Sequence, residues 1–169
     1  MTIADTDTKS ALQTLTHCLQ DHLSLNSIQS PVMLGIHTGG AWVATALQQT
    51  INPEIPLGTL DISFYRDDFS RIGMNPQVRP SDIPFEVDDK HIILVDDVLY
   101  TGRTIRAALN EIFAYGRPAS VILAVLIERD GRQLPVSADC VGNRVTLDDH
   151  QQIKLSGPDP LKLEIIEVS

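Results

Sequence analysis

The chain has 169 residues, a length that suits one domain with a full hydrophobic core. Its 22 acidic and 13 basic residues give a net charge of −9, which argues against a general nucleic-acid binder, because such proteins carry a basic face. An apolar share of 43% and a mean hydropathy of +0.00 predict a soluble globular protein, and no apolar run is long enough to span a bilayer.

Two further features bear on the cellular compartment. The N-terminal residues are acidic and polar, which predicts no signal peptide. Cys18 and Cys140 are the two cysteines, and they predict no disulfide framework. We therefore expect a cytoplasmic protein with no membrane partner.

An amphipathic helix is predicted over residues 10–25, after a polar segment. Its leucines recur at helical spacing and indicate one buried face: Leu12, Leu15, Leu19 and Leu23. His17, Cys18 and His22 lie on or beside this helix. A metal site there is disfavoured, because no second cluster of ligands follows nearby in the sequence.

A strand–loop–helix unit comes next. Residues 32–36 predict a buried strand, residues 37–40 a loop of small residues, and residues 41–49 a helix. The loop glycines are compatible with an ordinary turn, or with a loop whose backbone N–H groups bind an anion. Residues 57–62 predict another strand.

Residues 63–84 show no sustained apolar period and are rich in proline, glycine and arginine. Loops of this length inside a compact domain are usually functional or disordered. We expect a lid that excludes water and brings a cation, first of all Arg66, to a leaving anionic group. The alternative is a solvated hairpin in which Arg66 pairs with Asp67 or Asp68.

The chain is organised around residues 92–104. Four apolar residues predict a buried strand, Asp96 and Asp97 follow at its end, and a helix is predicted over residues 105–115. The carboxylates suit ribose hydroxyls, or water on a hard cation such as Mg²⁺. The intervening loop suits a phosphate at a helix N-terminus, and its residues are Val98, Leu99, Tyr100, Thr101, Gly102, Arg103 and Thr104. A sugar diol beside its own 5′-phosphate indicates a phosphoribosyl ligand.

The remaining third of the chain begins with residues 121–127, whose continuous apolar run predicts a second buried parallel strand. Residues 129–132 then stand on the ligand side of the sheet. Turns are predicted at Gly142-Asn143 and Gly157-Pro158, and a last strand at residues 161–168.

These elements predict an α/β fold, with a mostly parallel central sheet flanked by helices. We expect a single domain over residues 1–169. Its core spans about residues 30–130, with the lid at about 63–84. A small hood over the site is expected from about residues 1–29 and 131–169.

Several separated blocks, in the right order, carry a resemblance to a known family. Residues 95–104, with Tyr65-Arg66-Asp67-Asp68 upstream and Gly116-Arg117-Pro118 downstream, resemble the type I phosphoribosyltransferases. Within that family they are similar to the PyrR-type branch, the pyrimidine-operon attenuation regulators that also have uracil phosphoribosyltransferase activity. The resemblance covers roughly residues 32–142.

This resemblance implies the type I phosphoribosyltransferase fold and the reaction of uracil with phosphoribosyl pyrophosphate to give UMP and pyrophosphate. It implies a pyrophosphate site at Thr38, Gly39, Gly40 and Arg66. It implies a 5′-phosphate site in the loop at residues 98–104. Asp96, Asp97 and Arg66 become the candidate catalytic residues, and the two aspartates also the candidate residues for Mg²⁺, through ribose hydroxyls or water. A homodimer or higher homo-oligomer is implied as well.

Three departures from the family pattern concern the base and RNA. Gly39 stands where the family has an arginine, and Ser137 where the family often has another. The Pro-Thr-Ser segment expected after Gly142 is not evident. The uracil contacts are therefore left undefined, near Val141 and Gly142.

Other functions stay open at this point. One is an RNA-binding attenuator that senses UMP with little catalysis, although RNA binding needs a basic face and the helix over residues 10–25 lacks one. Another is a purine phosphoribosyltransferase, because the sugar-phosphate half of the site would be shared. A receiver domain phosphorylated on Asp96 or Asp97 is disfavoured, because it would carry its acidic pair after the first strand, which ends in His37-Thr38.

Overall fold

The computed structural model describes residues 5–62 and 81–169 of the chain. In chain order, its elements are α1 (Asp5–Leu25), β1 (Val32–Ile36), α2 (Gly39–Ile51), β2 (Leu57–Leu60), β3 (His91–Leu99), α4 (Arg103–Tyr115), β4 (Ser120–Arg129), β5 (Cys140–Val145), β6 (Gln151–Ser156) and β7 (Lys162–Glu167). Within the described ranges, no helix combines the length and the apolar character that crossing a bilayer requires.

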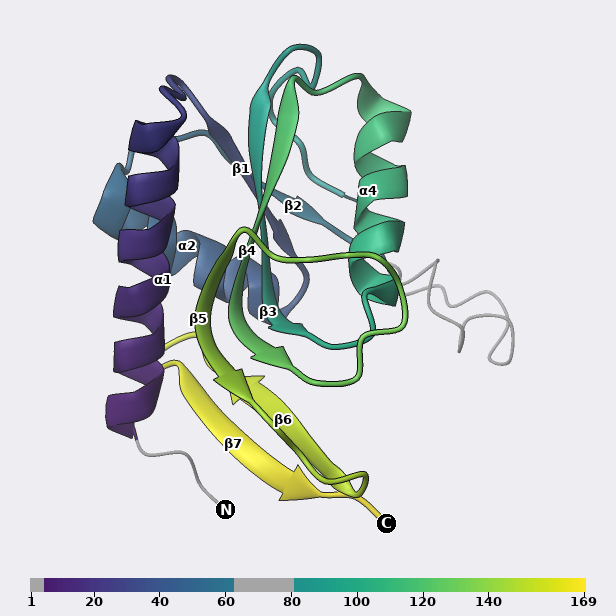
Figure 1. Cartoon of the computed structure of the whole chain (residues 1–169). Helices are drawn as coiled ribbons and strands as arrows, with labels where there is room; N and C mark the ends of the chain where they lie inside the picture. The colour runs from purple at the N-terminus through teal and green to yellow at the C-terminus, as the bar shows by residue number, and fades with distance from the viewer. Residues whose placement is uncertain (1–4, 63–80) are drawn as a thin grey trace.

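Five strands form one parallel sheet in the spatial order β2-β1-β3-β4-β5. The central strands are apolar along most of their length because helices cover both faces of the sheet (Figure 1). Strands β6 and β7 form a separate antiparallel hairpin, which lies at the lower end of the molecule in Figure 1. The predicted α/β fold with a parallel central sheet is confirmed.

Strand β3 supplies side chains to two cores, one on each face of the sheet. Ile93 and Val95 point to the face covered by α1 and α2, whereas Ile92 and Leu94 point to the face covered by α4. The helices complete the first core with Ala11, Leu15, Leu19, Val43, Ala44 and Leu47, and the second with Ile105, Ala107, Ala108 and Ile112.

Helix α1 is a full layer of the structure rather than only a hood. It packs most closely on β5, because Gly142 has no side chain: a Cβ there would lie 2.6 Å from the carbonyl oxygen of Ala11. Near its start the helix also reaches the hairpin, where the backbone N–H of Leu163 donates a hydrogen bond of 3.3 Å to Thr8 Oγ1. These contacts do not test the predicted division of the chain into core and hood, which stays a prediction.

Two predicted local structures are corrected. Strand β3 does not stop before the acidic pair, because it continues pairing with β4 as far as Leu99 and Glu128, so that Asp96 and Asp97 lie within the strand. The predicted turn at Gly142-Asn143 lies inside β5, where Asn143 pairs with Ile127. In both places a neighbouring strand extends the ladder, which a local sequence pattern does not reveal.

The segment predicted as a lid falls mostly outside the described residues, and so does Arg66. Where the chain is described again, Asp82 pairs with Thr59 through backbone hydrogen bonds of 2.8 and 2.9 Å. The far end of the segment is therefore tied alongside β2. The lid itself stays a prediction.

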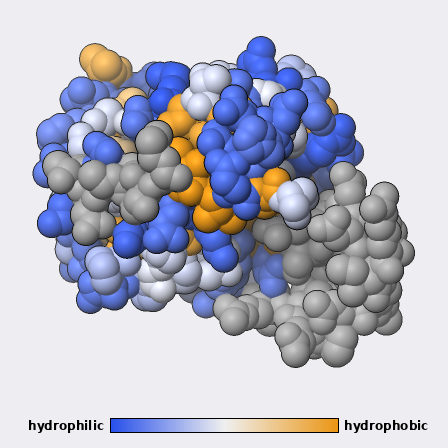
Figure 2. Space-filling model, turned by 90° about the horizontal axis from the view of Figure 1, so that it is seen from below, coloured by the Kyte–Doolittle hydropathy of each residue, from blue (hydrophilic) through white to orange (hydrophobic). Residues whose placement is uncertain are grey.

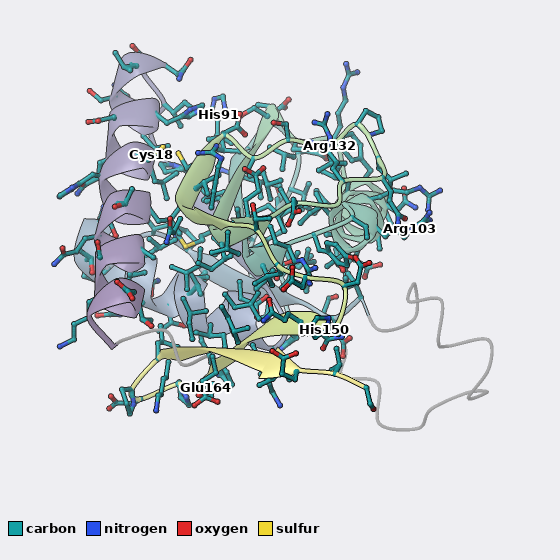
Figure 3. The ribbon with its side chains drawn as sticks, turned by 60° about the horizontal axis from the view of Figure 1, so that its bottom comes forward. Cys18, His91, Arg103, Arg132, His150 and Glu164 are labelled. Atoms are coloured by element: carbon teal, nitrogen blue, oxygen red, sulfur yellow. The ribbon has the colours of Figure 1, made fainter. Side chains whose placement is uncertain are left out.

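The two cysteines meet across the packed interface of α1 and β5. Both are free thiols, and Cys18 lies on the side of α1 that faces the sheet (Figure 3). Its Sγ lies 2.7 Å from Sγ of Cys140, which is 1% exposed. Burial, and then the hydrogen bond with Cys18, raise the pKa of the Cys140 thiol far above its ordinary value.

The core role of α1 predicts the cost of shortening a leucine on it. Leu15 is 0% exposed, so Leu15→Ala should lower the free energy of unfolding by about 2–5 kcal/mol, measured by urea denaturation. Leu25 is 84% exposed at the end of the same helix, and Leu25→Ala should change it by about 0.5 kcal/mol or less. Equal effects of the two substitutions would contradict a packed α1.

The raised pKa of Cys140 predicts its reactivity. Alkylation requires the thiolate, and the pKa of Cys140 is raised. The modification of Cys140 by iodoacetamide in the folded protein should therefore stay slow as pH rises through about 8.5, the ordinary pKa of a free cysteine. Mass spectrometry of the Cys18→Ser variant, with and without urea, would measure this. Folded and unfolded rates that coincide would contradict the buried, protonated thiol.

Candidate functional site

The site lies at the topological switch point of the sheet, between β1 and β3. Strands β1 and β3 are neighbours, but the helix after β1 covers one face of the sheet and the helix after β3 covers the other. In open parallel sheets, this arrangement opens a crevice beyond the carboxyl ends of the two strands. Figure 2 views that end of the molecule and shows apolar surface near the centre, bordered by hydrophilic residues.

A small cavity of about 100 Å³ lies between the end of β3 and the start of α4. Its walls are Asp96, Val98, Leu99, Tyr100, Thr101, Gly102, Thr104 and Ile105. Gly102, the N-cap of α4, takes φ +95°, which lets the chain turn tightly into the helix, and as a glycine it places no side chain over the helix N-terminus. The N–H groups of the first helical turn and two threonine hydroxyls suit a phosphate.

One predicted member of the phosphate loop lies elsewhere. Arg103 is exposed and extends outward from α4 (Figure 3), and its Nε donates a hydrogen bond of 3.2 Å to Gln133 Oε1. Its backbone N–H, by contrast, donates to Thr101 Oγ1 at 3.2 Å and so helps to shape the loop. Arg103 is thus not among the residues that line the cavity, and its contact with a phosphate stays a prediction.

The acidic pair is held in place by the backbone that carries it. Asp96 is 5% exposed, and its Oδ1 accepts a hydrogen bond of 2.9 Å from the N–H of Asp97. Oδ1 of Asp97 accepts another of 2.9 Å from the N–H of Val98. Asp96 lines the phosphate cavity, and Asp97 turns toward the loop after β1. Two ordered carboxylates at this position suit hydroxyl groups or a hydrated cation.

Helix α2 begins at Gly39, two residues earlier than the sequence predicted, and its first turn approaches this pair without side chains between them. A Cβ on Gly39 would collide with Oδ2 of Asp97, and a Cβ on Gly40 would lie 2.6 Å from the carbonyl oxygen of Val95. Thr38 precedes α2 as its N-cap, without a side-chain hydrogen bond to the helix. The structure thus brings residues 38–40 against Asp97, and the carboxylate of Asp97 fills the space beside Gly39.

A larger cavity of about 350 Å³ lies beyond the phosphate cavity, at the ends of β4 and β5. The two cavities share Leu99 and Tyr100, and the rest of the larger wall comes from residues 128–132 and 144–146. It is rich in charge: Arg144 Nε lies 2.7 Å from Glu128 Oε2, and the Arg129 guanidinium lies 4.0 Å from the centre of the Tyr100 ring.

Val141 and Gly142, the sequence-based location for a base, do not line this cavity. Gly142 instead packs against Ala11 of α1 and the carbonyl oxygen of Leu126. The signal that marks the cavity is the charged segment at residues 129–132, which directly follows a buried strand. Its partners at residues 144–146 carry no motif and become visible only when β5 pairs beside β4.

A resident metal cage is absent from the described ranges, where no three histidine, cysteine or acidic side chains converge. Asp96 and Asp97 nevertheless fit Mg²⁺ of the kind that arrives with a phosphorylated ligand. Such Mg²⁺ usually takes one or two carboxylates, and substrate oxygens and waters supply its other ligands.

The comparisons with known proteins agree with this geometry. Residues 6–155 match the model of the phosphoribosyl transferase domain family. The chain is 59% identical over 149 residues to Bifunctional protein PyrR of Nitrosococcus oceani, covering 87% of this chain and 84% of that protein. It is 56% identical over 151 residues to Bifunctional protein PyrR of Pseudomonas savastanoi pv. phaseolicola, covering 89% of each.

Solved structures extend the similarity of fold to more distant proteins. Trypanosoma cruzi hypoxanthine phosphoribosyl transferase superposes with a TM-score of 0.69 at 16% identity, covering 99% of this chain and 91% of that chain. The purine phosphoribosyltransferase of Pyrococcus horikoshii gives 0.64 at 23% identity, covering 86% and 89%. From its matched domain, its sheet and its relatives, the chain belongs to the type I phosphoribosyltransferase family and, within it, to the PyrR type.

Proposed function

We propose that the chain transfers the phosphoribosyl group of phosphoribosyl pyrophosphate to uracil, giving UMP and pyrophosphate. The observation that carries this proposal is the convergence of three features at one edge of the sheet: the phosphate cavity, the Asp96-Asp97 pair and the two glycines that begin α2, Gly39 and Gly40. Uracil as the base follows from membership of the PyrR type rather than from any single contact.

Each feature then takes one part of the substrate. The cavity at the start of α4 receives the 5′-phosphate, and the two carboxylates receive the ribose hydroxyls. The backbone N–H groups of Thr38, Gly39 and Gly40 receive the pyrophosphate. Arg66, which lies outside the described residues, is proposed to bring a further cation to the pyrophosphate from a lid at residues 63–84.

The reaction breaks the bond from C1 of the ribose to pyrophosphate oxygen, and the electron pair leaves with the pyrophosphate. N1 of uracil bonds to C1 and loses its proton, for which Asp97 is our candidate acceptor. Positive charge develops on the ribose and negative charge on the pyrophosphate. The residues at this edge act by positioning the partners and stabilising these charges, so no protein nucleophile is needed.

Mg²⁺ is the proposed cofactor, with Asp96 and Asp97 holding it through ribose hydroxyls or water. When bound, it would lower the charge repulsion around the pyrophosphate and polarise its oxygens. The arrangement supports this role because both carboxylates accept hydrogen bonds from backbone N–H groups, and because Asp96 lines the phosphate cavity while Asp97 lies beside Gly39.

Uracil is proposed to bind in the larger cavity, which adjoins the phosphate cavity through Leu99 and Tyr100. A volume of about 350 Å³ admits a small ring. Arg129 and Arg144 offer donors for carbonyl oxygens, and Glu128 and Asp130 offer acceptors for ring N–H groups.

The hairpin β6–β7 closes this end of the molecule, and we propose it as the main part of the hood. A cytoplasmic homodimer or higher homo-oligomer remains our proposal for the assembly.

Asp97→Asn should lower pyrophosphate release with uracil by about 100-fold or more, because the variant loses the charge that faces the reacting carbon. The assay measures pyrophosphate with phosphoribosyl pyrophosphate and Mg²⁺, separately with uracil, hypoxanthine, guanine and orotate. Asp21→Asn, an exposed acid on α1, is the matched control and should keep wild-type turnover. Turnover with a purine instead of uracil would contradict the proposal that uracil is the base, but not the assignment of the chain to the family.

A second activity is proposed from the relatives, whose shared name describes them as bifunctional. We propose that the chain also binds pyrimidine-leader RNA in a UMP-dependent manner. The net charge of −9 means that any RNA surface must be local, and that its affinity must fall steeply with salt.

This proposal predicts an electrophoretic shift of leader RNA that strengthens when UMP is added and weakens as salt rises. The same RNA in reversed sequence is the control for charge alone. No shift at about 10 µM protein, a concentration at which even non-specific binders associate at low salt, would remove the regulatory activity.

A further inference from the structure

Tyr100 stands at the boundary between the two cavities. It belongs to the loop that wraps the phosphate cavity, yet it also lines the larger cavity, and 45% of its whole surface is exposed. The phosphate loop was expected to use Tyr100 as a phosphate contact. Its ring is instead engaged by residues of the larger cavity.

Two contacts hold that ring. The Arg129 guanidinium lies 4.0 Å from the ring centre, a distance typical of a cation–π interaction. Gly131 lies against the ring edge, since a Cβ there would be 2.5 Å from Cε2 of Tyr100. With φ at +115°, Gly131 also takes a backbone conformation that side chains disfavour.

The arginine depends on the ring in return. Its Nη1 donates a hydrogen bond of 3.2 Å to the carbonyl oxygen of Gln151 in β6. Its Nε is buried and has no hydrogen-bond partner among the described residues. The aromatic face is therefore a principal partner on that side of the guanidinium.

The backbone joins the same two segments. The carbonyl oxygen of Thr101 accepts hydrogen bonds from the N–H groups of Gln133 at 3.0 Å and Leu134 at 3.2 Å. The loop that wraps the phosphate cavity is thus bonded to the two residues that directly follow the lining segment 128–132 of the larger cavity. These bonds give a direct path by which a movement of one segment can reach the other.

We propose that Tyr100 is a positioning residue that couples the two cavities, so that a phosphorylated ribose fixes Tyr100, and with it Arg129, for the base. This inference rests on the proposed function. It makes the base bind more tightly after the ribose phosphate than before it, and by linkage the reverse also holds.

The test measures coupling rather than turnover. Uracil affinity is determined by calorimetry with and without saturating ribose 5-phosphate, and the ratio of the two dissociation constants is the coupling factor. For the wild-type chain we expect a factor of about 5 or more. Tyr100→Leu should bring it close to 1, with ribose 5-phosphate affinity changed less than about threefold.

Three variants separate positioning from folding. Tyr100→Phe retains the aromatic face and should retain the coupling. Gly131→Ala should displace the ring and lose the coupling as Tyr100→Leu does. Tyr115→Leu, an exposed tyrosine at the end of α4, is the matched control and should behave as the wild type.

The outcomes distinguish this inference from the function on which it rests. If ribose 5-phosphate fails to bind the wild-type chain, the proposed function and the coupling both fall. If ribose 5-phosphate and uracil bind but the wild-type factor is 1, or Tyr100→Leu keeps the wild-type factor, only the coupling is overturned. In turnover, the coupling also predicts that Tyr100→Leu raises KM for uracil much more than KM for phosphoribosyl pyrophosphate.

Discussion

The site depends on one close approach between two backbones. The start of α2 lies directly on the end of β3, with Gly40 against the carbonyl oxygen of Val95 and Gly39 against the carboxylate of Asp97. Any side chain at these positions would push the loop after β1 away from the acidic pair. Because β1 and β3 are paired neighbours, this contact also fixes where the crevice of the parallel sheet opens.

The two halves of the site are built by different physical means. The phosphate half uses backbone N–H groups, glycine geometry and short hydroxyl side chains, all within a few consecutive residues at the start of α4. The other half uses charged side chains from the ends of β4 and β5, which are distant in sequence. A change in the charged residues of the second half therefore need not disturb the consecutive residues of the first half.

The edge strand β5 sets the position of the charged half of the site, which is the larger cavity. Strand β5 pairs in parallel with β4 and receives α1 through the bare backbone at Gly142, and the core residues of α1 hold that edge in place. The residues that line the larger cavity follow two positions later, at Arg144 and beyond. The packing of α1 on Gly142 thereby helps to place the charged side chain of Arg144 at the end of β5, although α1 itself does not line the cavity.

The sequence by itself determined the parallel α/β fold, and it placed Asp96, Asp97 and the glycine-containing loop at residues 98–104 between a strand and a helix, because these features depend on apolar runs and on a motif of consecutive residues. Only the tertiary structure decided that β3 continues through the acidic pair, that the carboxylate of Asp97 occupies the space beside Gly39, and that Tyr100 faces Arg129. It also showed that the larger cavity is lined by the segments around Arg129 and Arg144 and not by Gly142. These features arise from strand pairing and from contacts between residues far apart in the chain, and local periodicity carries no record of such contacts.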